Sequence, residues 1–261
     1  MTAPTSALPA PAPRRSLGRL HRPALLVWAA FVLLVTGLLL WLHLHEVPAE
    51  RACHSFFAYS PMGGHLPSCG YSAFTDANNL FNLLGEALGF SCVAVAAWAG
   101  GALLGRELES GTAELAWTQS VSPARWLAAK LTTAAVPVAA GGALLALLFG
   151  WAWSSDRDSL VSNWTYDRVF IPRGPLLPAL LLLGLAVGAL AGIALRRTLP
   201  ALGAAAAVTL VVRLYLRKAW TPLHGPLHGF WPVQLLATAM VLALAAAATV
   251  GAFCLLRRRA R

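Results

Sequence analysis

Six long apolar runs, separated by short polar intervals, dominate the hydrophobic pattern of the chain. Each run holds at least about 18 residues, enough for a helix rising about 1.5 Å per residue to cross most of a bilayer's hydrocarbon core. The pattern predicts an all-α integral membrane protein with six transmembrane helices. The expected spans cover residues 24–42, 80–104, 131–153, 176–195, 199–216 and 233–256.

The residues on either side of the first apolar run indicate what that run is and what precedes it. Residues 1–13 are rich in Ala, Pro, Ser and Thr, so we expect a disordered tail followed by one transmembrane domain over residues 14–261. The first apolar run closes with Trp41, Leu42 and His43 and lacks a small-residue cleavage site. It therefore favours a membrane span over a secretory signal peptide.

Composition supports a membrane protein. Hydrophobic residues make up 58% of the chain and charged residues only 11%, well below the roughly 25% that is usual in soluble domains. The net charge of +10 would suggest nucleic acid in a soluble protein. No recognition fold or basic helix accompanies that charge, so we expect no nucleic-acid partner.

The distribution of Lys and Arg predicts orientation in the cell membrane. With the N-terminus inside, most of the 20 basic residues fall on the cytoplasmic side, which the positive-inside rule favours for both termini. These residues are Arg14, Arg15, Arg19, Arg22, Arg106, Arg125, Lys130, Arg196, Arg197, Arg257, Arg258, Arg259 and Arg261. The loops at residues 43–79, 154–174 and 217–232 then face outward.

The interval between the second and third spans, residues 106–130, is the only long polar one with a helical, amphipathic pattern. Acidic residues alternate there with apolar ones, Gly111-Thr112 interrupts the run, and Ser122-Pro123 starts another helix. Short amphipathic helices of this kind lie on the membrane or dock a partner. The pattern alone is equally compatible with a solvated turn.

This interval also carries a recognisable motif. It reads RELESGT at residues 106–112, LAWTQSV at 115–121 and RWL at 125–127, followed by Lys130. The motif resembles the signature of type-two ABC export permeases, and more narrowly the six-span permease subunits common in high-GC bacteria. RRTLP at 196–200, FWPVQ at 230–234 and the C-terminal arginines are supporting matches. The resemblance runs from about the second span to the end of the chain.

The resemblance implies a mechanism. In such exporters two permease subunits form the pathway, and the cytoplasmic loop between spans two and three acts as a coupling helix that receives the motion of two separate ATPase subunits. The residues expected in or beside that contact are Arg106, Glu107, Glu109, Gly111, Thr112, Arg125 and Lys130. The segment of residues 14–22, which contains four arginines, would form an interfacial helix. Departures are Gly101-Ala102 in place of Ala-Pro, a short outer segment at 217–232, and no acidic residue after Gln234.

The chain has no G-x-x-x-x-G-K-[ST] loop, so we expect ATP and Mg²⁺ on the ABC ATP-binding partner and no cofactor or catalytic residue here. A non-transporting membrane scaffold or immunity protein is the main alternative. A membrane enzyme would need a catalytic constellation at one depth. An ion-coupled transporter would show inverted repeats and charged residues at the midplane. Neither is evident, and the substrate stays open.

A few polar residues interrupt the spans. Asn82 and Glu86 lie on one face of the second span, and Arg213 lies in the fifth. Ionisable residues inside a span are functional candidates, although Glu86 is also compatible with a solvated helix end. Arg213 has two alternatives: its side chain extends toward the interface, or it pairs with Glu86.

Cys53 and Cys69 both lie in the first outer loop, where a disulfide would close about 16 residues. We keep bridged and free thiols as alternatives. The outer histidines are interpreted as loop residues, with no metal site predicted. Small-xxx-small glycine pairs, including Gly184/Gly188, predict closely packed helices.

Overall fold

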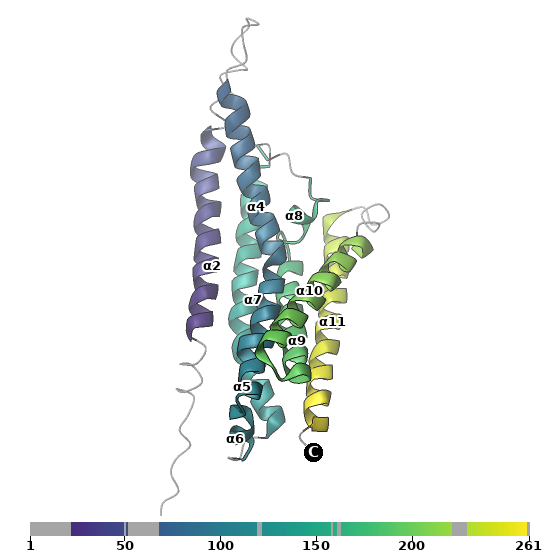
Figure 1. The fold of residues 1–261 in the computed structure, drawn as a ribbon. Coiled ribbons are helices and arrows are strands. Elements are labelled where there is room, and N and C mark those ends of the chain that lie inside the picture. Colours follow the sequence, from purple (N-terminus) through teal and green to yellow (C-terminus); the bar gives the residue numbers. More distant parts are fainter. Residues whose placement is uncertain are drawn as a thin grey trace, which may run out of the picture.

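The structure is a computed structural model and describes residues 22–49, 51, 68–118, 122–157, 159–160, 163–220 and 229–259. Six helices in these ranges are long and apolar enough to cross a membrane, and they run side by side (Figure 1). Helices and no strands occur among the described residues, so the all-α, six-span prediction is confirmed. The long helices are α2 (Arg22–Trp41), α4 (Ser68–Trp98), α7 (Pro123–Ser155), α9 (Leu176–Leu195), α10 (Thr198–Trp220) and α11 (Phe230–Arg259).

Several helices extend beyond the predicted spans. The loop predicted over residues 43–79 is wrong at both ends, because π-helix η1 (Leu42–Glu46) continues α2 and α4 already begins at Ser68. Local contacts hold η1 in place: the Trp41 and His45 rings stack at 4.1 Å, and Trp41 Nε1 donates to Glu46 at 3.2 Å. Polar residues alone therefore do not end these helices.

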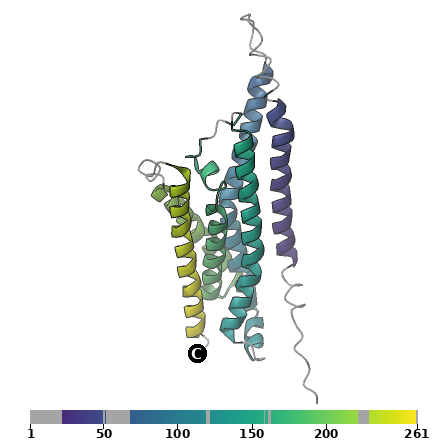
Figure 2. The ribbon, with the colours of Figure 1, turned by 180° about the vertical axis from the view of Figure 1, so that it is seen from behind.

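The bounds of α9 coincide with the predicted fourth span, residues 176–195. This helix is the centre of the bundle. It is the most thoroughly buried of the six long helices, and it contacts α4, α7, α10 and α11. By contrast, α2 lies at one edge against α7, as both views show (Figures 1 and 2). The indole Nε1 of Trp28 joins these two helices by donating to the carbonyl of Pro137 at 2.9 Å.

Glycines let α9 approach α4 closely, as the small-residue pairs predict. A Cβ added to Gly188 would lie 2.5 Å from the Ala96 carbonyl oxygen, and one added to Gly184 would clash with the carbonyl of Cys92. Both glycines face the backbone of α4 one turn apart. Only residues without a side chain permit this separation, so the glycine stripe fixes how the central helix fits the bundle.

The bundle has two distinct ends. One holds the short helices α5 (Arg106–Glu109) and α6 (Thr112–Thr118) together with the last residues of α11 (Figure 1). The other holds the end of α7, the short helix α8 (Asp167–Phe170) and the first turns of α9 and α11. The predicted tail at 1–13 and the interfacial helix at 14–22 lie outside the described residues, apart from Arg22 at the start of α2.

Candidate functional site

The candidate site is the segment of residues 106–118, which leaves the bundle between α4 and α7. It follows π-helix η2 (Ala99–Gly105), and π-turns inside helices frequently mark functional positions. Gly111 has a φ of 71°, a left-handed conformation that glycine adopts without strain, and it turns the chain from α5 into α6. Ser122 then caps α7 by accepting from the Arg125 backbone N–H at 3.4 Å, with Pro123 at the first helical position. The predicted break and restart are both confirmed.

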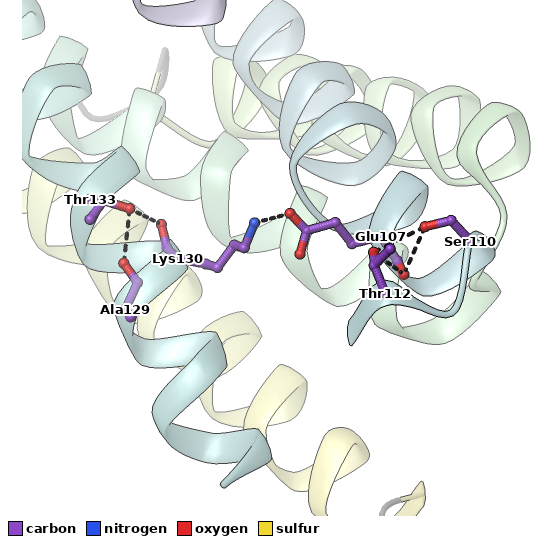
Figure 3. A network of polar contacts seen from close by, with 6 residues as sticks. All are labelled: Glu107, Ser110, Thr112, Ala129, Lys130 and Thr133. Carbon is purple, nitrogen blue, oxygen red and sulfur yellow. Dashed lines mark hydrogen bonds and ion pairs between the residues drawn. The ribbon is translucent and has the colours of Figure 1, made fainter. Parts of the chain in front are cut away.

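An ion pair joins α5 to α7. The ammonium of Lys130 donates to the Glu107 carboxylate, and the two side chains point toward one another in Figure 3. Lys130 is only 2% exposed, and its ammonium also lies 5.9 Å from the centre of the Trp126 ring. A buried charge of this kind needs its partner, because removing one member leaves the other without compensation.

A second connection joins α5 to α10. The Glu109 carboxylate accepts from the backbone N–H of Thr198 at 2.8 Å and from the Thr198 hydroxyl. Thr198 is the first residue of α10, where unpaired N–H groups and the helix dipole favour a negative charge. Glu109 therefore caps a helix that lies 89 residues further along the chain.

A third, weaker contact reaches the turn between α9 and α10. Arg196 ends α9 in a left-handed conformation, with a φ of 50°, and its guanidinium donates to Glu114 at 3.4 Å. Both side chains are substantially exposed, so this pair adds little stability. Together the three contacts attach the segment to α7, to α10 and to the end of α9.

The segment is amphipathic in the folded chain. Leu108 and Ala113 are buried, and the Trp117 and Trp126 rings meet edge to face at 5.8 Å. Leu115 is 62% exposed at the same end. The inner face therefore packs on the bundle, while the outer face presents a leucine beside charged residues.

The structure divides the seven predicted coupling residues into two groups. The Glu107, Glu109 and Lys130 side chains are engaged within the chain, and the Thr112 hydroxyl donates to the Glu107 carbonyl at 3.2 Å. Gly111 forms the turn. Arg106 and Arg125 form the second group: both are exposed, and the described residues place no carboxylate within ion-pair distance of either guanidinium.

Thr198 is the residue that sequence reasoning misses. The run Thr198-Leu199-Pro200 is a helix-start signal, and it could have been identified as a cap site. Its partner could not, because nothing in the sequence connects Glu109 to a residue 89 positions away.

The intramembrane polar residues are partly brought together. The Arg213 guanidinium lies 4.0 Å from the Glu86 carboxylate, its Nε donates to the Gly89 carbonyl at 2.8 Å, and it covers the Phe90 ring at 3.8 Å. Arg213 is 3% exposed and lies at the limit of ion-pair distance from Glu86, which agrees with the proximity that the pairing alternative expects. Asn82 is half-buried one turn before Glu86 on α4.

The remaining candidates are limited by what the structure describes. Cys53 lies outside the described residues, and the side chain of Cys69 is not described either, so their disulfide stays a prediction. Cys92 is buried and Cys254 exposed, both as free thiols. Within the described ranges, no group of three or more His, Cys, Asp or Glu side chains is arranged to hold a metal ion.

Six long apolar helices, with α9 at the centre and a short helical segment attached to one end, indicate a multi-pass membrane protein. Residues 24–220 match the model of the family described as ABC-2 membrane transporter related, and the chain belongs to that family. The family is a membrane component of ABC transporters and is not itself catalytic. A search of the curated proteins and a search of the solved structures each found no match.

Proposed function

We propose that the chain is the transmembrane permease subunit of an ABC-type exporter in the cell membrane. ATP is hydrolysed on a separate ATP-binding subunit, which holds the ATP and Mg²⁺. Family membership supports the ABC assignment. The observation that supports coupling is the attachment of residues 106–118 to α7 and α10 through two carboxylates, Glu107 and Glu109.

The attachment explains how motion of a partner would enter the bundle. A force on the outer face, at Leu115 or Arg106, displaces a segment that is fastened to two different spans. The Glu107–Lys130 pair transmits the displacement to α7, and the Glu109–Thr198 contact transmits it to α10. Because α9 packs against both of these helices, the central helix responds as well. The π-helix η2 supplies the adjustable joint between α4 and α5.

The complete transporter needs a second permease copy, and both termini lie on the cytoplasmic side with the ATPase. The positive-inside distribution supports this orientation, since residues 106–118, Arg196 and the C-terminal arginines share one end of the bundle. Outward transport follows from the resemblance to export permeases. A scaffold or immunity protein, the alternative, would not need an exposed docking face at this position.

Co-purification with the ATP-binding subunit tests the proposal. Wild type, Leu115→Asp and the matched control Arg257→Ala/Arg258→Ala would each be co-expressed with the ATPase and compared for complex formation and ATP turnover. Leu115 is exposed, so its replacement leaves the buried Glu107–Lys130 pair intact. Arg257 and Arg258 are exposed at the same end of the bundle. We expect Leu115→Asp to lose the partner and the control to retain it.

Two results would contradict the proposal. One is a well-folded wild-type chain with which no ATPase co-purifies. The other is a Leu115→Asp variant that retains ATPase binding and turnover as well as the control does. Either would move the scaffold alternative to the front.

A further inference from the structure

Among the residues that the structure describes, cations outnumber carboxylates at the end of the bundle opposite residues 106–118. Three carboxylates at this end are paired with basic side chains: Asp156 with His43 and Arg51, Asp167 with Arg217, and Glu86 with Arg213. Within the ranges that the structure describes, four cations at this end have no carboxylate at ion-pair distance. These are Arg157, Arg168, Arg173 and Lys218.

Two of these arginines converge on one tryptophan. The Arg173 guanidinium lies 3.9 Å from the centre of the Trp153 ring and 4.3 Å from the centre of the Phe230 ring. Arg157 lies 5.0 Å from the same Trp153 ring. Burial, and then the nearby charge of Arg157, lower the pKa of Arg173 below its ordinary value. An arginine stays charged even so, and in the described part of the chain both guanidinium groups contact aromatic rings and neither is paired with an acid.

A buried amide lies beside this arrangement. Gln234, near the start of α11, is 0% exposed, and neither its amide nitrogen nor its amide oxygen has a hydrogen-bond partner among the described residues. The nitrogen is directed at Gly174, the neighbour of Arg173, so closely that a side chain there would clash with it. Buried polar groups are normally satisfied, and an unpaired N–H donor against the residue that follows Arg173 is suited to an acceptor-rich ligand.

The position of these residues along the bundle indicates which kind of ligand can reach them. Trp153 lies near the end of α7, Arg173 precedes α9, and Phe230 begins α11, so the residues share the level at which the spans end. Aromatic residues gather at that level in membrane proteins, where lipid headgroups lie. Guanidinium groups bind phosphate oxygens in a bidentate manner, with charge-assisted hydrogen bonds.

We propose that Arg157 and Arg173, supported by Trp153, Phe230 and Gln234, form a site for the phosphate of an anionic phospholipid headgroup. Two guanidinium charges with no carboxylate at ion-pair distance among the described residues favour a lipid with net negative charge over a zwitterionic one. The site lies at the far end from the ATPase-facing segment, and it does not depend on coupling to that partner.

Native mass spectrometry of the purified full chain tests the site. Binding of phosphatidylglycerol and of phosphatidylcholine would be compared in wild type, in Arg173→Gln, in Arg157→Gln and in Lys218→Gln. Among the described residues, the cations over the Trp153 and Phe230 rings are Arg157 and Arg173, so Lys218, an exposed cation at the same end, controls for the loss of one charge. Thermal unfolding of each variant checks that it is folded. Arg157 is exposed, so its variant remains informative if Arg173→Gln fails to fold.

We expect phosphatidylglycerol to bind at least about tenfold more tightly than phosphatidylcholine. Arg173→Gln and Arg157→Gln should each remove most of that preference, and Lys218→Gln should retain it. Equal binding of the two lipids, or an equal loss in all three variants, would overturn the proposal. A competition experiment with millimolar inorganic phosphate separates the two sources of phosphate. If inorganic phosphate completely displaces phosphatidylglycerol from wild type, the site binds free phosphate and the lipid assignment is wrong.

Discussion

Glu107 of α5 and Lys130 of α7, 23 residues apart in the chain, form an ion pair whose ammonium is almost completely buried. The pair lies where a segment outside the bundle meets a membrane span. The two side chains, which the sequence analysis expected at the contact with a partner protein, neutralise one another within the chain. The same residues can still serve coupling, but they do so by holding the segment to α7.

Removing one member of this pair should destabilise the protein. We expect Lys130→Met to lower the free energy of unfolding by about 3–5 kcal/mol, because Glu107 is left partly buried without its cation. The double variant Lys130→Met/Glu107→Leu should recover most of that loss. Denaturant unfolding of the purified protein in detergent measures both. A double variant no more stable than Lys130→Met would show that the pair is not what the buried lysine depends on.

The Glu109–Thr198 contact predicts a different kind of loss. Glu109→Ala removes the cap of α10 at an exposed helix end, so the protein should still fold. Its transport should fall relative to its ATP turnover, because α10 no longer follows the segment. Glu109→Gln keeps an oxygen acceptor and serves as the matched control. Transport per ATP hydrolysed in reconstituted vesicles is the measurement, and an unchanged ratio in Glu109→Ala would exclude a transmitting role.

The glycine stripe of α9 allows a comparison between two glycines. Gly188→Ala places a Cβ 2.5 Å from the Ala96 carbonyl oxygen, so α4 and α9 must separate. Overpacking of this kind costs about 1–3 kcal/mol. Gly203 on α10 has nothing within 4 Å of an added Cβ, so Gly203→Ala should cost nothing. Thermal unfolding and the yield of monodisperse protein compare the two; equal behaviour would show that the close approach is not required.

Hydrophobic pattern was sufficient to predict six spans, because a bilayer demands about 20 apolar residues per crossing whatever the tertiary packing. It predicted the bounds of α9 well, since Pro175 and the Arg196-Arg197 pair bracket an uninterrupted apolar run. It failed at His43–Glu46 and Ser68–Asn79, where polar residues continue a helix without breaking it. Hydropathy indicates which part of a helix prefers the bilayer. It does not indicate where the helix begins or ends.

The position of the candidate site in the chain could be predicted from the sequence, but the contacts of its side chains could not. The motif at residues 106–130 located it, and Gly111 and Ser122-Pro123 marked the turns between its helices. The partners of its acids depend on how α7 and α10 pack against α5, and that packing leaves no local signature. The arginines that contact Trp153 likewise belong to no sequence motif. Their cation–π contacts follow from the three-dimensional arrangement of the spans.

Arg213 supports a last prediction, concerning which of its contacts matters. Its Nε donates to the Gly89 carbonyl at 2.8 Å, whereas its distance to Glu86 is 4.0 Å and the Glu86 side chain is 47% exposed. An ion pair at that distance with one exposed member contributes about 1 kcal/mol or less. We therefore expect Arg213→Met to destabilise the protein by about 2 kcal/mol through the lost charged hydrogen bond, and Glu86→Gln to have little effect. In a double-mutant cycle followed by denaturant unfolding, the coupling energy should stay below about 1 kcal/mol. A coupling as large as the whole effect of Arg213→Met would instead make Glu86 the main partner and place the pair in a drier environment than its exposure indicates.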